Sequence, residues 1–167
     1  MFITTTGLKP VRRFLAPTTR HQAVVLKLAA ALLRHVESRK LGRVLQAPCD
    51  VVLAAKTVVQ PDILFVQRRR RGIICSRNLL GAPDLVVDVL SRETQKCDLR
   101  AKKRIYAHFE VPEYWAVDAD GTMIETHLWS ELGYIAAGRF GRWDRVSSPL
   151  LPDLNLPLSR IFNGFDN

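Results

Sequence analysis

Two aspartates and one lysine have the residue types and spacing of a metal-dependent hydrolytic site. Asp62 and Asp88 each lie in an apolar, strand-like run, and Lys102 follows in a segment with helical spacing. Aspartate is disfavoured in strands, and a buried carboxylate needs a compensating cation or metal. The pattern therefore predicts a site that binds a divalent metal and acts on a charged substrate.

The alternation of residues 83–90 predicts which carboxylates point in the same direction. In a strand, Asp84 and Asp88 fall on one face. Asp88 lies in the middle of the run, whereas Asp62 and Asp84 each follow a proline and also fit a turn, the role that we favour for Asp84. If the strand that carries Asp62 is the neighbour, Asp62 and Asp88 converge on one ion, and carboxylate oxygens suit Mg²⁺.

Lys102 belongs to a predicted helix over residues 93–109. Leu99, Lys102 and Tyr106 follow one another at intervals of three and four residues, so they share the face that packs inward. Lys103 falls off this stripe. An inward lysine could reach the carboxylates and stabilise charge on a phosphate. The alternative is a surface pair between Lys102 and Asp98.

The elements that position these residues form a mixed pattern. An amphipathic helix is predicted from Thr18 to Leu41, with Thr18 and Thr19 as possible N-caps and Gly42 as its stop. A meander of antiparallel strands should follow it, and a strand–helix–strand crossover should come next. The predicted fold class is α/β (mixed α+β), with a mixed central sheet flanked by helices. The predicted strands cover residues 43–46, 50–54, 58–66, 83–91, 113–118, 122–129 and 134–137, and a C-terminal tail over 149–165 should wrap the core.

Composition limits the remaining possibilities. The 167 residues predict a single domain over 1–167, with an irregular N-terminal segment over 1–17. A net charge of +9 favours a polyanionic partner such as nucleic acid. Three scattered cysteines predict neither a zinc site nor a disulfide framework, which suggests a reducing, cytoplasmic setting. No apolar run long enough for a membrane span and no signal peptide is evident.

Four consecutive arginines, Arg68, Arg69, Arg70 and Arg71, stand before Gly72. Adjacent like charges repel, so these side chains must be solvated or paired with anions. A solvated turn and a phosphate-contacting loop fit the run equally well. Basic residues on the predicted helix are further candidates for contacts with backbone phosphates. They are Arg100, Lys103 and Arg104.

Together these segments resemble the Uma-two-like restriction-endonuclease family of the PD-(D/E)XK nuclease superfamily. The resemblance covers roughly residues 17–160 and is carried by Pro61-Asp62, by Pro83-Asp84-Leu85-Val86-Val87-Asp88-Val89-Leu90-Ser91, by Asp98-x-x-x-Lys102-x-x-x-Tyr106, and by Val111-Pro112-Glu113-Tyr114-Trp115-x-Val117-Asp118.

The resemblance implies a restriction-endonuclease-like core and a Mg²⁺- or Mn²⁺-dependent endonuclease that acts on DNA. Asp62 and Asp88 match the family's two metal-binding acids. Lys102 matches a catalytic lysine that has moved from the strand to the following helix. Supporting roles fall to Asp98, Tyr106 and His21. Cleavage of both strands would favour a homodimer.

The chain departs from the family pattern at two positions of interest. Asp88 stands where the family usually has glutamate, and Glu110 stands where it usually has glycine. Two other functions are open from the sequence. One is a nucleic-acid-binding protein that keeps the nuclease fold without cutting. The other is an interaction domain whose acids are paired with nearby arginines.

Overall fold

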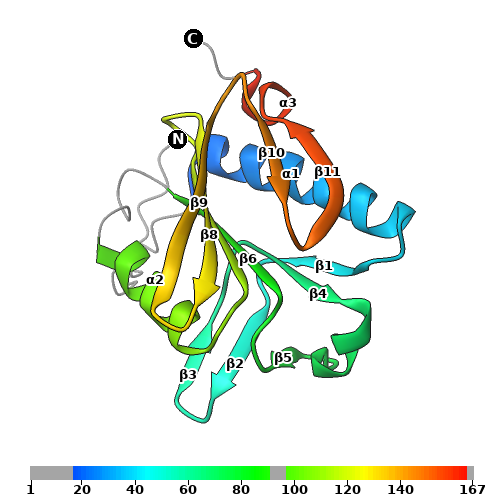
Figure 1. The fold of residues 1–167 in the computed structure, drawn as a ribbon, viewed down its shortest axis with the longest axis vertical. Coiled ribbons are helices and arrows are strands. Elements are labelled where there is room, and N and C mark those ends of the chain that lie inside the picture. The colour runs from blue at the N-terminus through cyan, green and yellow to red at the C-terminus, as the bar shows by residue number, and fades with distance from the viewer. Residues whose placement is uncertain (1–16, 91–96, 165–167) are drawn as a thin grey trace, which may run out of the picture.

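The computed structural model describes residues 17–90 and 97–164 (Figure 1), with the side chains of residues 97–99 outside the description. The irregular segment predicted over residues 1–17 thus lies almost wholly outside the described residues, as does the predicted helix start at residues 93–96. Within the described ranges, no helix is both long and apolar enough to cross a bilayer.

A six-stranded mixed sheet with the order β1-β4-β6-β7-β8-β9 forms the centre of the fold (Figure 1). Strands β6 and β7 run parallel, and the other described neighbours in this sheet run antiparallel. Helix α2 (Cys97–His108) connects the parallel pair. This arrangement confirms the predicted mixed central sheet flanked by helices. The strands are β1 (Gly42–Gln46), β4 (Ile63–Gln67), β6 (Leu85–Leu90), β7 (Glu113–Asp118), β8 (Met123–Ser130) and β9 (Gly133–Gly141).

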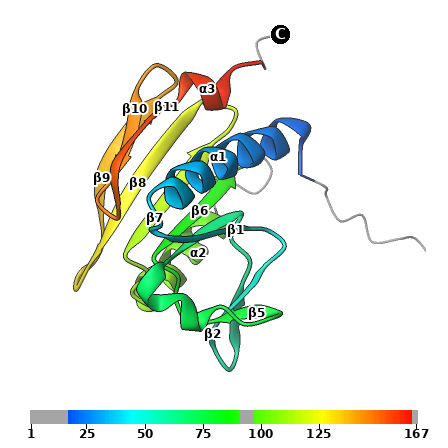
Figure 2. The same cartoon turned by 90° about the vertical axis from the view of Figure 1, so that its right-hand side faces the viewer.

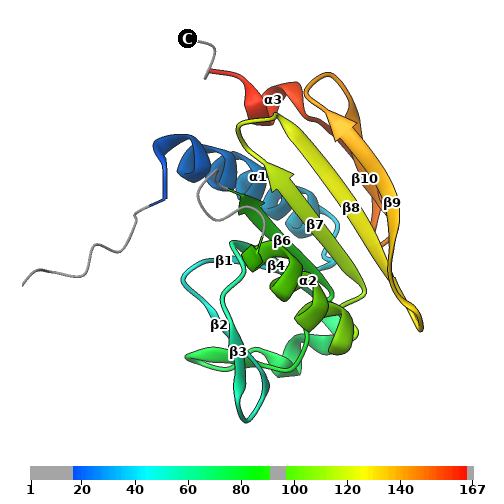
Figure 3. The ribbon, with the colours of Figure 1, turned by 90° about the vertical axis from the view of Figure 1, so that its left-hand side faces the viewer.

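Two helices cover opposite faces of this sheet. Helix α1 (Thr19–Ser38) crosses the face seen in Figure 2, and α2 lies over the opposite face, seen in Figure 3. Strand β6 divides its side chains between two apolar clusters: Leu85 and Val87 pack with α1, whereas Val86 packs with Tyr106 of α2. The alternation predicted for this strand is therefore confirmed, and Asp88 falls on the α2 side.

The C-terminal part of the chain covers α1. Strands β10 (Arg145–Ser148) and β11 (Leu151–Pro157) form a hairpin, and the short helix α3 (Ser159–Phe162) follows (Figure 2). Buried residues of this region share a cluster with α1, among them Leu156 and Phe162. The predicted wrapping of the core by the tail is confirmed for its described residues.

The strands after α1 differ from the predicted meander. The strand expected over residues 58–66 is two strands, β3 (Thr57–Val59) and β4, separated at Gln60 to Asp62. Pro61 has no amide hydrogen to give to a ladder, so it interrupts the strand. Strand β1 pairs with β4, whereas β2 (Asp50–Ala54) pairs with β3 and with β5 (Asn78–Leu80) in a separate small sheet. The three-residue β5 was not predicted.

The end of α1 also differs from the prediction. The residue in the left-handed conformation is Lys40, with a φ of 55°, and not Gly42. The amides of Lys40 and Leu41 donate to the carbonyls of Glu37 and Val36 at 3.1 and 3.0 Å, which closes the helix. Gly42 instead begins β1.

Glu110 has a φ of 56°, a left-handed conformation, at the position where the family that the sequence resembles usually has glycine. Such a conformation costs a residue with a Cβ atom about 1–2 kcal/mol. We therefore expect Glu110→Gly to raise the free energy of unfolding by about 1 kcal/mol. Thermal unfolding should show a midpoint about 2–4 °C higher. Glu110→Ala retains the Cβ atom and should give no such gain; an equal gain from both variants would contradict the explanation.

Glu113 lies at the start of β7 and is 1% exposed. Its carboxyl group accepts hydrogen bonds from Nε1 of Trp115 and Oγ of Ser148, both at 2.6 Å. Ser148 belongs to β10, so this network joins the central sheet to the C-terminal hairpin. Burial raises the pKa of Glu113 above its ordinary value of 4.5, although the two hydrogen bonds oppose that shift.

The raised pKa makes stability depend on pH. The folded protein holds the proton of Glu113 to a higher pH than the unfolded chain does, so ionisation destabilises the fold. Stability should fall as pH rises from 4.5 through the raised pKa. Glu113→Gln cannot ionise, so its stability relative to the native chain should increase over the same interval. Urea unfolding at several pH values measures this difference, and a constant difference would contradict the assignment.

Candidate active site

Asp88 is the buried acid at the centre of the candidate site. It lies in β6 and is 2% exposed. Oδ1 of Asp88 accepts a hydrogen bond from Nζ of Lys102 on α2 at 3.2 Å. The side chain of Lys102 is 27% exposed, so the lysine contacts the carboxylate and also reaches solvent. The predicted inward orientation of Lys102 is confirmed, and its predicted reach to Asp88 is observed.

Asp62 lies beside Asp88 at the point where β4 begins. The pairing of Ile63 with Val87 in antiparallel register brings Asp62 opposite Asp88. Oδ2 of Asp62 accepts a hydrogen bond from the backbone amide of Val89 at 2.7 Å. The carboxylate thus takes the place of a backbone acceptor where the β4–β6 ladder ends, which fixes the first acid next to the second.

His21 approaches Asp62 from α1. The amide of His21 donates to Oγ1 of Thr18, the helix N-cap, at 3.1 Å, which confirms the predicted N-cap. Nε2 of His21 lies 3.4 Å from Oδ1 of Asp62. The carboxylates of Asp62 and Asp88 therefore lie side by side where β4 begins. His21 of α1 contacts Asp62, and Lys102 of α2 contacts Asp88.

Aromatic residues pack around Asp88 on the α2 side. Tyr106 lies one turn after Lys102, is fully buried, and has its ring centroid 5.4 Å from that of Tyr114. Burial raises the pKa of Tyr114, and the Asp88 carboxylate raises it further. Burial, and next the Asp88 carboxylate, also raise the pKa of Tyr134 on β9. Both phenols therefore keep their protons beside the carboxylate.

Tyr114 and Tyr134 were not singled out from the sequence. Tyr114 could have been found, because the alternation of residues 113–118 puts Tyr114 and Ala116 on one face and the parallel register pairs Asp88 with Ala116. Tyr134 comes from a strand distant in the sequence, so only the fold reveals it.

The donor set of this site suits a hard divalent cation. Asp62 and Asp88 provide carboxylate oxygens. Mg²⁺ is usually bound by one or two carboxylates, with water and substrate phosphate as its other ligands. The described residues contain no group of three or more His, Cys, Asp or Glu side chains placed to hold a metal. Two carboxylates could hold Mg²⁺ or Mn²⁺ with water or substrate oxygens in the remaining positions.

The basic residues of α2 lie next to this region. Arg100, Lys103 and Arg104 line a cavity of about 280 Å³ together with Tyr134. Arg100 and Arg104 are exposed, whereas Lys103 is partly buried. Burial lowers the pKa of Lys103, and Glu125 opposes this shift. Asp98 lies in α2, but its side chain is outside the described residues.

The run of four arginines is a short 3-10 helix, η1 (Arg68–Ile73), and not a loop. Within it, Arg70 makes structural contacts: Nη1 lies 2.9 Å from Oδ1 of Asp84, and Nη2 donates to the Ala82 carbonyl at 2.8 Å. Asp84 is 2% exposed and also accepts from the amide of Gln67. Asp84 thus anchors η1 as the buried partner of Arg70, which is more than the turn role predicted for it. The exposed members of the run are Arg68, Arg69 and Arg71.

Comparisons with known proteins agree with this architecture. Residues 14–159 match the Uma2 family, described as "Putative restriction endonuclease". The fold resembles a crystal structure described as a putative nuclease belonging to DUF820 from Anabaena variabilis ATCC 29413. The TM-score is 0.72 at 16% sequence identity, over 87% of this chain and 82% of the other. No curated protein matches the sequence.

Proposed function

This chain belongs to the Uma2 family of restriction-endonuclease-like proteins, and we propose from this premise that it hydrolyses DNA phosphodiester bonds with the help of Mg²⁺ or Mn²⁺. One observation carries the proposal: Lys102 contacts the buried Asp88, and Asp62 is bonded to the very next amide. Two acids and a lysine, remote in the sequence, thus meet at one end of the sheet.

Asp62 and Asp88 would hold the metal through carboxylate oxygens. Such an ion lowers the pKa of a bound water and neutralises charge on the scissile phosphate. The hydrogen bond from the Val89 amide keeps Asp62 in place. His21 contacts the other oxygen of Asp62 and orients the same carboxylate.

Lys102 supplies the positive charge of the site. Its amine stands beside Asp88 and is partly exposed, so it can donate a hydrogen bond to the attacking water or to a phosphate oxygen. Such a donor stabilises the charge that develops in the transition state. Tyr106 packs against Tyr114 and so holds α2, and with it Lys102, against the sheet.

The basic residues would bind the rest of the substrate. Arg100, Lys103 and Arg104 line one cavity beside the site, where they can contact backbone phosphates without reading sequence. The net charge of +9 favours association with DNA. Because one site cuts one strand, cleavage of both strands would involve a homodimer.

Incubation with supercoiled plasmid tests the function. We expect the native chain to nick or linearise the plasmid with Mg²⁺ or Mn²⁺, and to leave it intact with EDTA. The variant that combines Asp62→Ala with Asp88→Ala should not cut under any condition. If the native chain binds DNA in a salt-sensitive way but does not cut it, the result supports a nucleic-acid-binding protein that keeps the fold. If the native chain shows no cleavage and no binding, the result supports an interaction domain.

A further inference from the structure

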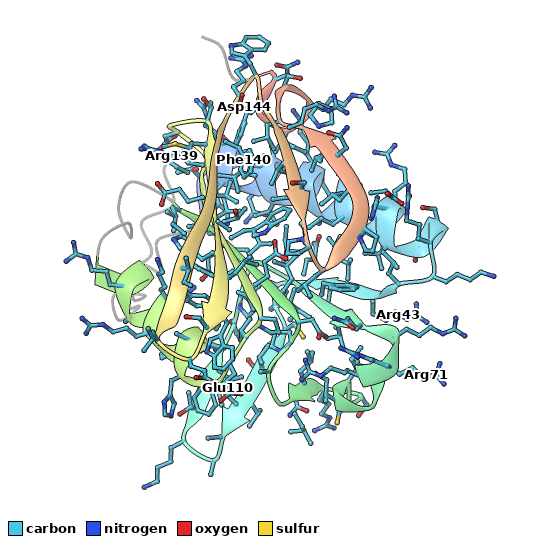
Figure 4. The ribbon with its side chains drawn as sticks, in the orientation of Figure 1. Arg43, Arg71, Glu110, Arg139, Phe140 and Asp144 are labelled. Carbon is cyan, nitrogen blue, oxygen red and sulfur yellow. The ribbon has the colours of Figure 1, made fainter. Side chains whose placement is uncertain are left out.

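A second basic site lies at the opposite end of β4 from Asp62. Lys40, Gly42, Arg43, Arg68 and Arg71 line a cavity of about 210 Å³, which we call the cationic pocket. They come from the end of α1, from β1 and from η1. Figure 4 shows Arg43 and Arg71 at the same edge of the molecule, on the side away from α2.

The charges of the cationic pocket are not neutralised within the described part of the chain. Its lining consists of two arginines from η1, Arg43, Lys40 and a glycine, with no carboxylate. Among the described residues, none of the four basic side chains forms an ion pair, whereas Arg70 of the same run is paired with Asp84. All four side chains are exposed, so water and salt screen part of their mutual repulsion, and a bound anion would neutralise the rest.

The backbone of the cationic pocket shows a second unusual feature. Lys40 occupies a left-handed conformation with a φ of 55°, where glycine would cost less. Two residues later, a Cβ atom at Gly42 would collide with the backbone oxygen of Val66. Lysine thus stands at a position that favours glycine, and the glycine that follows allows β1 to approach β4 closely.

We propose that the cationic pocket binds a phosphate group of the nucleic-acid backbone, away from the point of cleavage. The choice of DNA as the bound polyanion rests on the proposed nuclease function. Arginine presents planar donors that match phosphate oxygens, and the cavity gathers three of them. No apolar side chain lines it, so it lacks the groups that insert into a lipid surface.

The distance to the candidate active site makes this a separate contact. Asp62 and Arg68 are six residues apart along β4, which corresponds to about 20 Å in a strand. A phosphate in the cationic pocket is therefore not the scissile one. Its binding should affect the affinity for DNA and the KM of cleavage, while kcat stays unchanged.

Fluorescence anisotropy with a labelled 20-base-pair DNA duplex in EDTA tests the proposal without catalysis. The double variant Arg68→Gln/Arg71→Gln should bind about tenfold more weakly at moderate salt, and the negative slope of log affinity against log salt should become shallower by about 1. The matched control Lys56→Gln/Arg77→Gln removes the same charge from exposed residues outside the cationic pocket and should have a much smaller effect.

Each outcome of this experiment decides one way. Equal losses from both double variants would show a general charge effect and overturn the proposal, as would unchanged binding. The same double variant is also tested for binding to phosphatidylserine vesicles. If it loses vesicle binding but binds DNA as the native chain does, the cationic pocket binds a membrane surface, and the proposal is overturned. Because the readout needs no metal, the cationic pocket can be confirmed even if the plasmid is never cut, and it can fail even if cleavage occurs.

Discussion

Asp88→Asn should reduce metal-dependent DNA cleavage by on the order of 10³-fold, comparable with loss of a principal electrostatic contact in a catalytic site. Asparagine has the shape of aspartate but no charge, so it cannot hold a divalent cation as strongly. Asp88 is 2% exposed and contacts Lys102, so its charge acts where water screens little. Initial rates of cleavage of a labelled duplex, in excess Mg²⁺, measure the effect.

Asp88→Glu is the informative control for this substitution. It keeps the charge and restores the acid that the related family usually has at this position. We expect cleavage well above that of Asp88→Asn, and thermal unfolding should show that both variants are folded. If Asp88→Asn cuts as fast as the native chain, Asp88 does not belong to the catalytic machinery.

Lys102→Ala should lower kcat by about 10²–10³-fold, because its amine lies 3.2 Å from Asp88 and would stabilise charge in the transition state. The affinity for DNA should change little, because Lys102 is only one of several basic residues that would contact phosphate. Single-turnover cleavage and anisotropy separate the two effects. Lys102→Arg keeps the charge and should recover part of the lost rate.

The neighbouring lysine offers a matched comparison. Lys103 lines the cavity that Tyr134 also lines, and Glu125 acts on its charge. Lys103→Ala should raise KM with kcat nearly unchanged. The assignment of Lys102 would be wrong if the two alanine variants exchanged these phenotypes, or if both altered KM alone.

The sequence predicted the parts of the site that depend on local periodicity. The alternation of β6 placed Asp88 on a defined face, and the three- and four-residue spacing of α2 turned Lys102 inward. Both expectations agree with the contact between the two residues. Local patterns of this kind are decided within a single element, so no knowledge of the other strands was needed.

Pairing between distant strands was harder to predict. Residues 58–66 read as one strand, but Pro61 divides them, and β1 pairs with β4 across the β2–β3 hairpin. The choice of partner depends on which apolar faces meet in three dimensions, and short runs such as β5 carry little signal. The same limit applies to Tyr134 and to the cationic pocket, whose members come from separate elements.

Individual arginines of the basic run also could not be distinguished. Arg70 and Arg71 are identical in type and adjacent, yet Arg70 is held by the buried Asp84 while Arg71 lines a cavity. Helical geometry within η1 directs them differently, and the sequence predicted a loop. Only contacts between elements separate a structural arginine from one that is available to an anion.

Crystals of the native chain soaked in MnCl₂ provide the most direct measurement of the metal site. We expect an anomalous manganese peak within about 2.0–2.4 Å of a carboxylate oxygen of Asp62 and of Asp88, with waters in the remaining positions. Crystals of Asp88→Asn, soaked in the same way, should lose that peak. A fully soaked native crystal without manganese between the two carboxylates, or with manganese bound only elsewhere, would show that Asp62 and Asp88 do not form a metal site.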